Sequence, residues 1–259
     1  MTPFILEVDA IEVSSWVSRY LWPFFRIAGF LMVMPLIGSR LVPQRIRILL
    51  ALLIAILVTP MLPPMPHTDG LSVETMVISA QQLLIGIAFA FMLEMLMQVM
   101  ILAGQLIAMQ TGLGMALTID PGHGINVAVV AQWFLIFANL LFINLNGHLV
   151  ALEIVIDSFY AIPVGFDGLS SDTLFKMVGY AQWMFASALV LSLPALTVML
   201  VVNIAFGVMA RLAPQLNIFA VGFPVTMMLG LVILWLSFTG FGDEFYELLQ
   251  EMLQFMRSM

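Results

Sequence analysis

The sequence contains no cysteine and a single lysine, Lys176, among its 259 residues. The absence of cysteine excludes a disulfide framework, thiolate catalysis and metal sites built on cysteine ligands. The eight basic residues, set against 15 acidic ones, provide no basic patch for a phosphate backbone, so a nucleic-acid-binding protein is excluded. Charged residues make up only 9% of the chain, whereas a soluble domain carries about 25%. So few polar groups cannot cover the surface of a water-soluble globular enzyme, and that class is excluded as well.

Apolar residues are abundant, at 63% of the chain with a mean hydropathy of +1.12. Such a chain must present apolar side chains to lipid, to other apolar subunits, or to both. Alternating strand patterns are absent, and unpaired backbone is costly in hydrocarbon, so the sequence predicts an all-α fold of the integral-membrane type. Each of the long apolar stretches approaches the ~20 residues of a spanning helix, and they lie at about 16–37, 46–62, 76–105, 127–147, 178–208 and 217–239.

Two stripes of polar residues run through the apolar stretches. One has Gln98 and Gln105 on the same helical face as Glu94. The other repeats every seven residues: Gln132, Asn139, Asn146 and Glu153. One interpretation is a wetted ion path, and the other is interhelical hydrogen bonding that sets subunit register. We favour the second, because amides outnumber acids and do not relay protons readily.

The remaining polar residues do not form a recognisable catalytic or metal site. His123 and His148 lie 25 residues apart without HxxxH or HExxH spacing, so surface or capping roles are favoured over metal ligation. Asp120, which precedes Pro121, is typical of a turn. Nucleotide-binding glycine motifs are missing. The sequence therefore predicts a non-enzymatic protein without a cofactor.

The segment 104–124, GQLIAMQTGLGMALTIDPGHG, is the most unusual part of the chain. It begins as a helix, is predicted to break at Gly112 and Gly114, and stays apolar. Non-helical backbone at membrane depth survives only when it is buried in protein or lines a cavity. The segment is therefore either an apolar loop that occludes a pore or an ordinary connector, and the residues alone favour neither.

The C-terminal segment 243–259 has a different pattern. Its apolar residues fall on one face of a helix: Phe245, Leu248, Leu249, Met252 and Met256. Because the other face is acidic and would be repelled by anionic lipid, we expect this helix to dock on a partner subunit rather than on a membrane surface.

Four stretches together resemble one protein family. They are RIAGFLMVMPLIGSRLVPQRIRILLALLIAILVTP (26–60), the GLGMA…DPG region (112–122), NGHLVALEIVIDSFYAIPVG (146–165) and LPALTVMLVVNIAFGVMARLAPQLNIFAVGFPVTMMLGLVIL (193–234). The chain is similar over nearly its whole length to the FliR/SctT family of type III secretion export gates. The run RLAPQLNIFAVGFP is the most specific part of this resemblance.

The resemblance implies an assembly in which one copy joins FliP and FliQ in a helical spiral. FlhB wraps this gate, FlhA surrounds it, and the proximal rod proteins grow from it. Apolar helices would then be buried by sister subunits as well as by membrane lipid. The implied location is the bacterial inner membrane at the flagellar basal body, with part of the assembly on the periplasmic side.

The resemblance also implies the internal organisation of a single domain. Kinked helical hairpins at about 1–125 and 126–242 are joined by a plug loop and followed by the helix 243–259. The plug loop corresponds to residues 106–122, with these candidate residues: Leu106, Met109, Gly112, Leu113, Gly114, Met115 and Leu117. A subunit contact is expected at Arg211, Pro214, Gln215 and Asn217.

The implied function is a non-catalytic channel for unfolded flagellar proteins, which the apolar loop closes. The alternative is an ion-coupled membrane transporter that uses Glu94 and Arg26 as its coupling pair.

Overall fold

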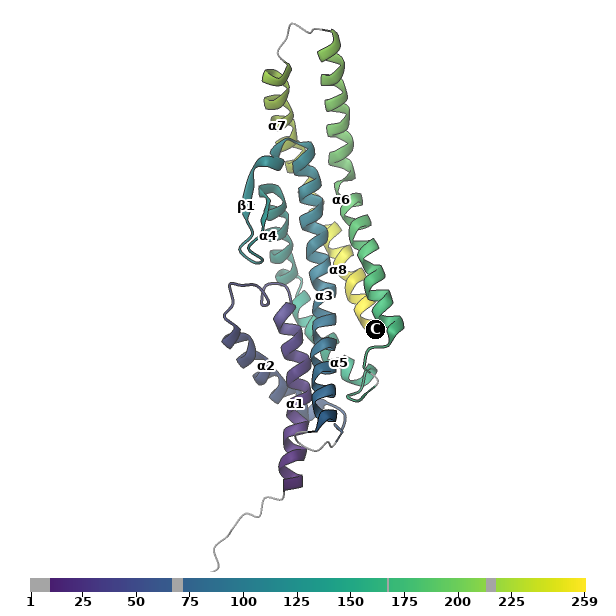
Figure 1. Ribbon diagram of the computed structural model, residues 1–259. Helices are drawn as coiled ribbons and strands as arrows, with labels where there is room; N and C mark the ends of the chain where they lie inside the picture. Colours follow the sequence, from purple (N-terminus) through teal and green to yellow (C-terminus); the bar gives the residue numbers. More distant parts are fainter. Residues whose placement is uncertain (1–9, 67–71, 167, 213–217) are drawn as a thin grey trace, which may run out of the picture. The chain divides into compact units, whose positions relative to one another are not determined.

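The computed structural model describes residues 10–66, 72–166, 168–212 and 218–259, and the chain is almost entirely helical (Figure 1). The prediction of an all-α fold is confirmed. The helices are α1 (Ala10–Val33), α2 (Gln44–Val58), α3 (Val73–Gln110), α4 (Val129–Asn144), α5 (Gly147–Ala161), α6 (Ser171–Leu212), α7 (Ile218–Ser237) and α8 (Phe241–Arg257). Short 3₁₀ turns lie at Thr59–Met61 and Leu113–Met115.

Each of the six apolar stretches forms a helix, but two elements were missed. Helix α5 carries Glu153 and Asp157 on its exposed side, and these acids interrupt the apolar run that would have indicated it. The second missed element is a small antiparallel sheet of β1 (Leu117–Ile119) and β2 (Asn126–Ala128). The expectation of helices throughout was wrong there, because a three-residue strand is too short to show an alternating pattern.

Local signals in the sequence explain where several helices begin. The Ser72 hydroxyl accepts a hydrogen bond from the backbone N–H of Thr75 at the start of α3. The Ser170 hydroxyl does the same for Thr173 at the start of α6. A serine in this position satisfies one of the backbone donors that a helix leaves free at its N-terminus. Pro43 precedes α2 and prevents the preceding turn from continuing as helix.

The chain divides into two compact units that interleave along the sequence. The first comprises residues 1–92, 149–176 and 256–259, and the second comprises 93–148 and 177–255. Because α3 is 38 residues long, its first half belongs to one unit and its second half to the other.

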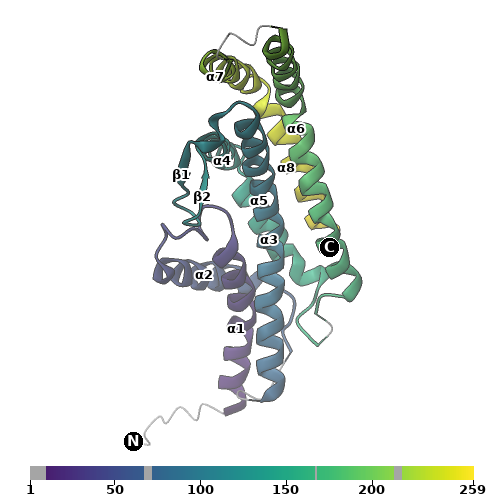
Figure 2. The same ribbon diagram turned by 45° about the horizontal axis from the view of Figure 1, so that its top comes forward.

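In the first unit, α1 packs closely along the first half of α3 (Figure 2). Two glycines make this approach possible. A Cβ on Gly29 would collide with the carbonyl oxygen of Leu83, and a Cβ on Gly86 would collide with that of Arg26. Small residues of this kind let two helix backbones approach until they are in direct contact.

In the second unit, the rest of α3 packs on α4, where a Cβ on Gly104 would lie 2.5 Å from the Cα of Ala131. Helix α8 packs on α4 and α6 in the same unit. The Phe241 ring meets the Phe134 ring edge-on at 5.2 Å, and the Phe255 ring stacks on Tyr180 at 3.9 Å.

The predicted apolar face of α8 is present, but it is covered differently from our expectation. Leu248 is half-buried. The other four residues of the face are fully buried: Phe245, Leu249, Met252 and Met256. The chain itself covers this face, so docking on a partner or a membrane is not needed to shield it. The sequence pattern predicts an apolar face but carries no information on which surface will cover it.

Three helical segments are long and apolar enough to cross a membrane within the described residues: Gln44–Met61, Val73–Gln110 and Ser171–Leu212. The number rises to five if each of two bent helix pairs counts as one span. The most apolar part of the α3 segment is 72% buried within the protein, against 22% for the other two. The outer faces of α2 and α6 therefore need lipid or other subunits to cover them.

Candidate functional site

The glycine-rich segment after α3 begins with a sharp end to the helix. Thr111 turns its hydroxyl back onto the carbonyl oxygens of Ile107 and Ala108, at 3.0 and 3.2 Å. Gly112 then adopts a positive φ of 77°, a conformation that favours glycine because it has no Cβ. The predicted break at Gly112 is therefore confirmed.

Helix α7 packs against this break. A Cβ on Gly230 would lie 2.5 Å from the Cβ of Thr111, and one on Gly112 would lie 3.3 Å from the Phe223 ring. The helix end is thus held between its own capping residue and a neighbouring helix. The hairpin segment that follows Gly112 therefore starts from a backbone position held in place by packing.

The chain then forms a β-hairpin. Leu117 pairs with Ala128, Thr118 with Val127 and Ile119 with Asn126. Asp120 closes the turn, because its backbone N–H donates to Ile125 O at 2.8 Å and its Oδ1 accepts from Gly122 N at 3.0 Å. The interpretation of Asp120 as a turn residue is confirmed.

The last turn of α3, the 3₁₀ turn after it and the hairpin present apolar side chains outward. Met115 is 93% exposed, Met109 75% and Leu117 60%. The other candidate plug residues are half-buried: Leu106, Gly112, Leu113 and Gly114. The sequence has no charged side chain between Glu94 and Asp120. Residues 106–119 therefore form an uncharged, apolar segment at the end of α3.

A polar contact joins the turn of the hairpin to the middle of α3. The ring of His123 places Nδ1 2.6 Å from Asp120 Oδ2 and Nε2 3.2 Å from Glu94 Oε1. Gln98 donates to the same Glu94 oxygen at 3.1 Å. Sequence reasoning did not find this contact, because Glu94 and His123 lie on different elements. The spacing of Asp120 and His123 within DPGH was the available signal for their pairing.

Comparison with known proteins agrees with the resemblance seen in the sequence. A family model described as bacterial export proteins, family 1, matches residues 17–252. The flagellar biosynthetic protein FliR of Escherichia coli K12 is 33% identical over 89% of this chain and 88% of its own length. The chain belongs to the FliR family of bacterial export proteins. Other members include FliR of Pectobacterium carotovorum, 36% identical over 90% of the chain and 88% of its own length, and FliR of Bacillus subtilis, 28% identical over 83% and 84%.

The polar stripe on α3 of this FliR-family chain is partly realised. Glu94 and Gln98 are half-buried and bonded to each other, as their spacing of four residues predicts, and Gln105 is half-buried further along the helix.

The second stripe does not continue along one helix. Gln132 and Asn139 lie half-buried on α4, but α4 ends at Asn144, and Asn146 is exposed with a positive φ of 55°. The seven-residue spacing from Gln132 to Glu153 therefore crosses the break between α4 and α5. Residues on the two sides of this break do not share one helical face. His148, just beyond the break, is half-buried beside the Phe142 ring.

The expected subunit contact after α6 is only partly visible. Arg211 is exposed in the last turn of α6, where a cation interacts favourably with the helix dipole. Pro214, Gln215 and Asn217 lie outside the described residues.

Arg26 lies in the core of the first unit with no exposed surface. Its guanidinium donates to Gln82 Oε1 at 2.8 Å, to Ser158 Oγ at 2.9 Å and to the Ile162 carbonyl oxygen at 2.9 Å. It also lies 4.0 Å from the centre of the Phe159 ring. All of these partners are uncharged, so the Arg26 side chain acts as a clamp between α1, α3 and α5.

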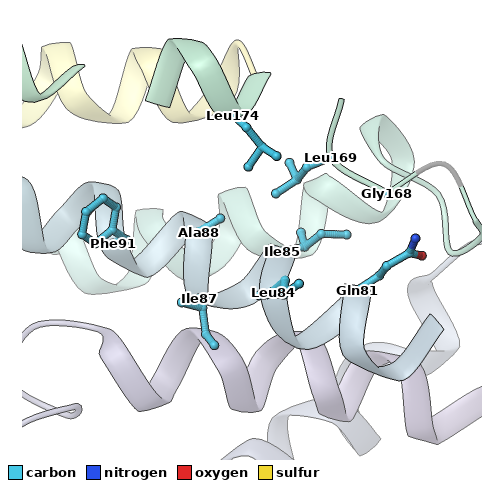
Figure 3. Close-up of a pocket in the computed structure, with 9 residues that line it drawn as sticks. All are labelled: Gln81, Leu84, Ile85, Ile87, Ala88, Phe91, Gly168, Leu169 and Leu174. Atoms are coloured by element: carbon cyan, nitrogen blue, oxygen red, sulfur yellow. The ribbon is translucent and has the colours of Figure 1, made fainter. Parts of the chain in front are cut away.

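The first unit also holds an apolar pocket of about 450 Å³ (Figure 3). Gln81 is the only polar side chain among its lining residues, and its amide nitrogen donates to the Phe166 carbonyl oxygen at 2.8 Å. Because the lining residues carry no ionisable group, the pocket is suited to apolar groups rather than to acid–base or metal chemistry. It is lined by Gln81, Leu84, Ile85, Ile87, Ala88, Phe91, Gly168, Leu169 and Leu174.

Proposed function

We propose that this chain is a non-catalytic subunit of the flagellar protein export gate and that residues 106–122 close its channel. Membership of the FliR family supports a role in export, and relatives at 33% and 36% identity carry the name flagellar biosynthetic protein FliR. In this proposal, one copy assembles with FliP and FliQ around a channel for unfolded proteins, in contact with FlhB, FlhA and the proximal rod.

One observation carries the closing role: the uncharged segment 106–119 at the end of α3 exposes Met115 almost completely. Leaving a large apolar side chain in water rather than burying it costs about 1.5–3 kcal/mol. The walls of a narrow channel would supply the missing cover. Methionine adapts to irregular surfaces, and an apolar constriction blocks ions by excluding water.

The exposed outer faces of α2 and α6 support assembly within a membrane-embedded complex. In this proposal, membrane lipid and the subunits FliP and FliQ cover those faces at the inner membrane. The chain purified alone is then expected to aggregate, whereas the chain co-purified with FliP and FliQ is expected to be stable. An image of the co-purified assembly would count the copies and locate residues 106–122. A stable homo-oligomer that binds a small substrate would contradict the proposal.

The closing role is tested by deleting residues 110–116 and measuring ion leakage in cells that assemble the complex. The deletion is expected to raise leakage because it removes the apolar constriction. Met115→Asp is expected to do the same by adding a hydrated charge. The matched control is Met228→Asp on α7, at a methionine that is 70% exposed. Unchanged leakage in both loop variants, with the assembly intact, would refute the closing role.

The alternative of an ion-coupled transporter requires Glu94 and Arg26 to act as a pair. Arg26 donates to Gln82, Ser158 and Ile162. Glu94 contacts His123 and Gln98. Each residue is thus engaged elsewhere in the described structure, which favours the gate over the transporter.

A further inference from the structure

We propose that Glu94 and His123 are positioning residues that fasten the tip of the hairpin to α3 and so hold the channel-closing segment in its closed place. The contact runs from Asp120 through the His123 ring to Glu94. Its consequence for leakage rests on the proposed function of residues 106–122, whereas the fastening itself rests on geometry alone.

The hairpin needs such a fastening because it is short. Each strand has three residues, and an isolated two-stranded hairpin is at best marginally stable in water. Within the described residues, its strands are anchored at the base by the buried Ala128, which pairs with Leu117, and by the hydrogen bond from Val129 N to Ala116 O at 2.9 Å, while Val127 is buried on the middle pair. Ile119 and Ile125, nearest the tip, are 67% and 51% exposed. Apolar burial therefore holds the base of the hairpin and not its tip.

The polar network supplies the hold at the tip. Asp120 is buried, with 2% of its side chain exposed, and it fixes the turn through Gly122 N. The His123 side chain is 43% exposed and spans from this turn to Glu94, of which 19% is exposed. The two ring nitrogens of His123 thus face one carboxylate each, and the ring bridges the turn and the helix. Gln98 orients the Glu94 carboxylate from the next turn of α3.

The position of Glu94 defines how far the hairpin folds back. Glu94 lies sixteen positions before the end of α3 at Gln110, which corresponds to about 24 Å along the helix. Fastening the tip at Glu94 therefore keeps the hairpin folded back along α3, with Met115 and Leu117 held near the helix end. Releasing the tip frees the outer part of the hairpin to move away from α3, while its base stays held at Gly112 and Ala128.

The absence of cysteine makes a direct test possible. A single reporter, Val127→Cys, places a thiol on the middle pair of the hairpin, at a position that is 2% exposed. A membrane-impermeant maleimide labels it only when the hairpin beyond its base moves away from its packing. The full-length chain is labelled within its assembly in membranes, and the labelling rate is normalised to the denatured protein. Glu94→Gln and His123→Ala are each expected to raise the rate about threefold to tenfold, the effect of losing one hydrogen bond of ordinary strength at a partly exposed site.

A mutant cycle separates fastening from general structural damage. The double variant Glu94→Gln/His123→Ala is expected to label no faster than the faster single variant, because both changes remove the same contact. Glu74→Gln, at an exposed acid in the first turn of α3, is the matched control and is expected to leave the rate unchanged. His123→Ala alters an exposed turn residue, so it keeps the test valid even if Glu94→Gln impairs assembly.

The outcomes distinguish this inference from the proposed function. Labelling and ion leakage rising together support both. Faster labelling without leakage supports the fastening and refutes the closing role. An unchanged labelling rate in both single variants overturns the fastening, even if deletion of 110–116 still raises leakage.

Discussion

The buried guanidinium of Arg26 provides the sharpest prediction for stability. Replacement by methionine keeps a long side chain in place but removes three hydrogen bonds to Gln82, Ser158 and Ile162. Hydrogen bonds that involve a charged group contribute about 1.5–3 kcal/mol each. Without the guanidinium, Gln82 Oε1 and the Ile162 carbonyl oxygen stay buried without this donor, at about 1–3 kcal/mol each, so we expect a total loss of about 3–5 kcal/mol.

The assay is thermal unfolding of the purified assembly. A loss of about 3–5 kcal/mol corresponds to a decrease of about 6–20 °C in the midpoint for a chain of this size. Arg26→Lys is expected to recover little, because a lysine cannot reach acceptors on separate helices as the guanidinium fork does. The control is Arg19→Met, at an exposed position on the same helix, which is expected to change the midpoint little.

The partner residue sharpens the test. Gln82 is fully buried, its amide nitrogen has no hydrogen-bond partner in the described structure, and its amide oxygen accepts from Arg26. The double variant Arg26→Met/Gln82→Leu is therefore expected to be more stable than Arg26→Met alone by about 1–3 kcal/mol. An Arg26→Met midpoint equal to that of the wild type, or strictly additive effects of the two changes, would refute the clamp.

The remaining predictions concern packing and use the same unfolding assay. Gly86→Ala is expected to destabilise by at least about 1–3 kcal/mol because its methyl group would overlap the α1 backbone, whereas Gly179→Ala, which faces open space, is expected to be neutral or stabilising; equal midpoints would contradict the close approach of α1 and α3. Phe245→Ala is expected to cost about 3–5 kcal/mol because the ring is fully buried. Tyr246→Ala, at the adjacent and 48% exposed position, is expected to cost much less, and a reversed order would contradict the packing of α8.

Much of the candidate site is local in the sequence and could be predicted from it. The break at Gly112, the turn at Asp120 and the apolar character of residues 106–122 depend on neighbouring residues and on glycine's access to positive φ. The hydrogen bond between Glu94 and Gln98 follows from a spacing of four residues on a helix. The contact between Glu94 and His123 could not be predicted, because it depends on how far the hairpin folds back along α3.

The sequence by itself determined that this chain is helical and apolar and that lipid or other subunits must shield its apolar side chains. Apolar run length and periodicity depend only on the order of residues. It also determined the family, through runs such as RLAPQLNIFAVGFP. Only the tertiary structure decided which surface covers α8, which neutral groups surround Arg26, and which side chain reaches Glu94. These are contacts between residues far apart in the chain, and no local pattern specifies them because each depends on how whole helices pack.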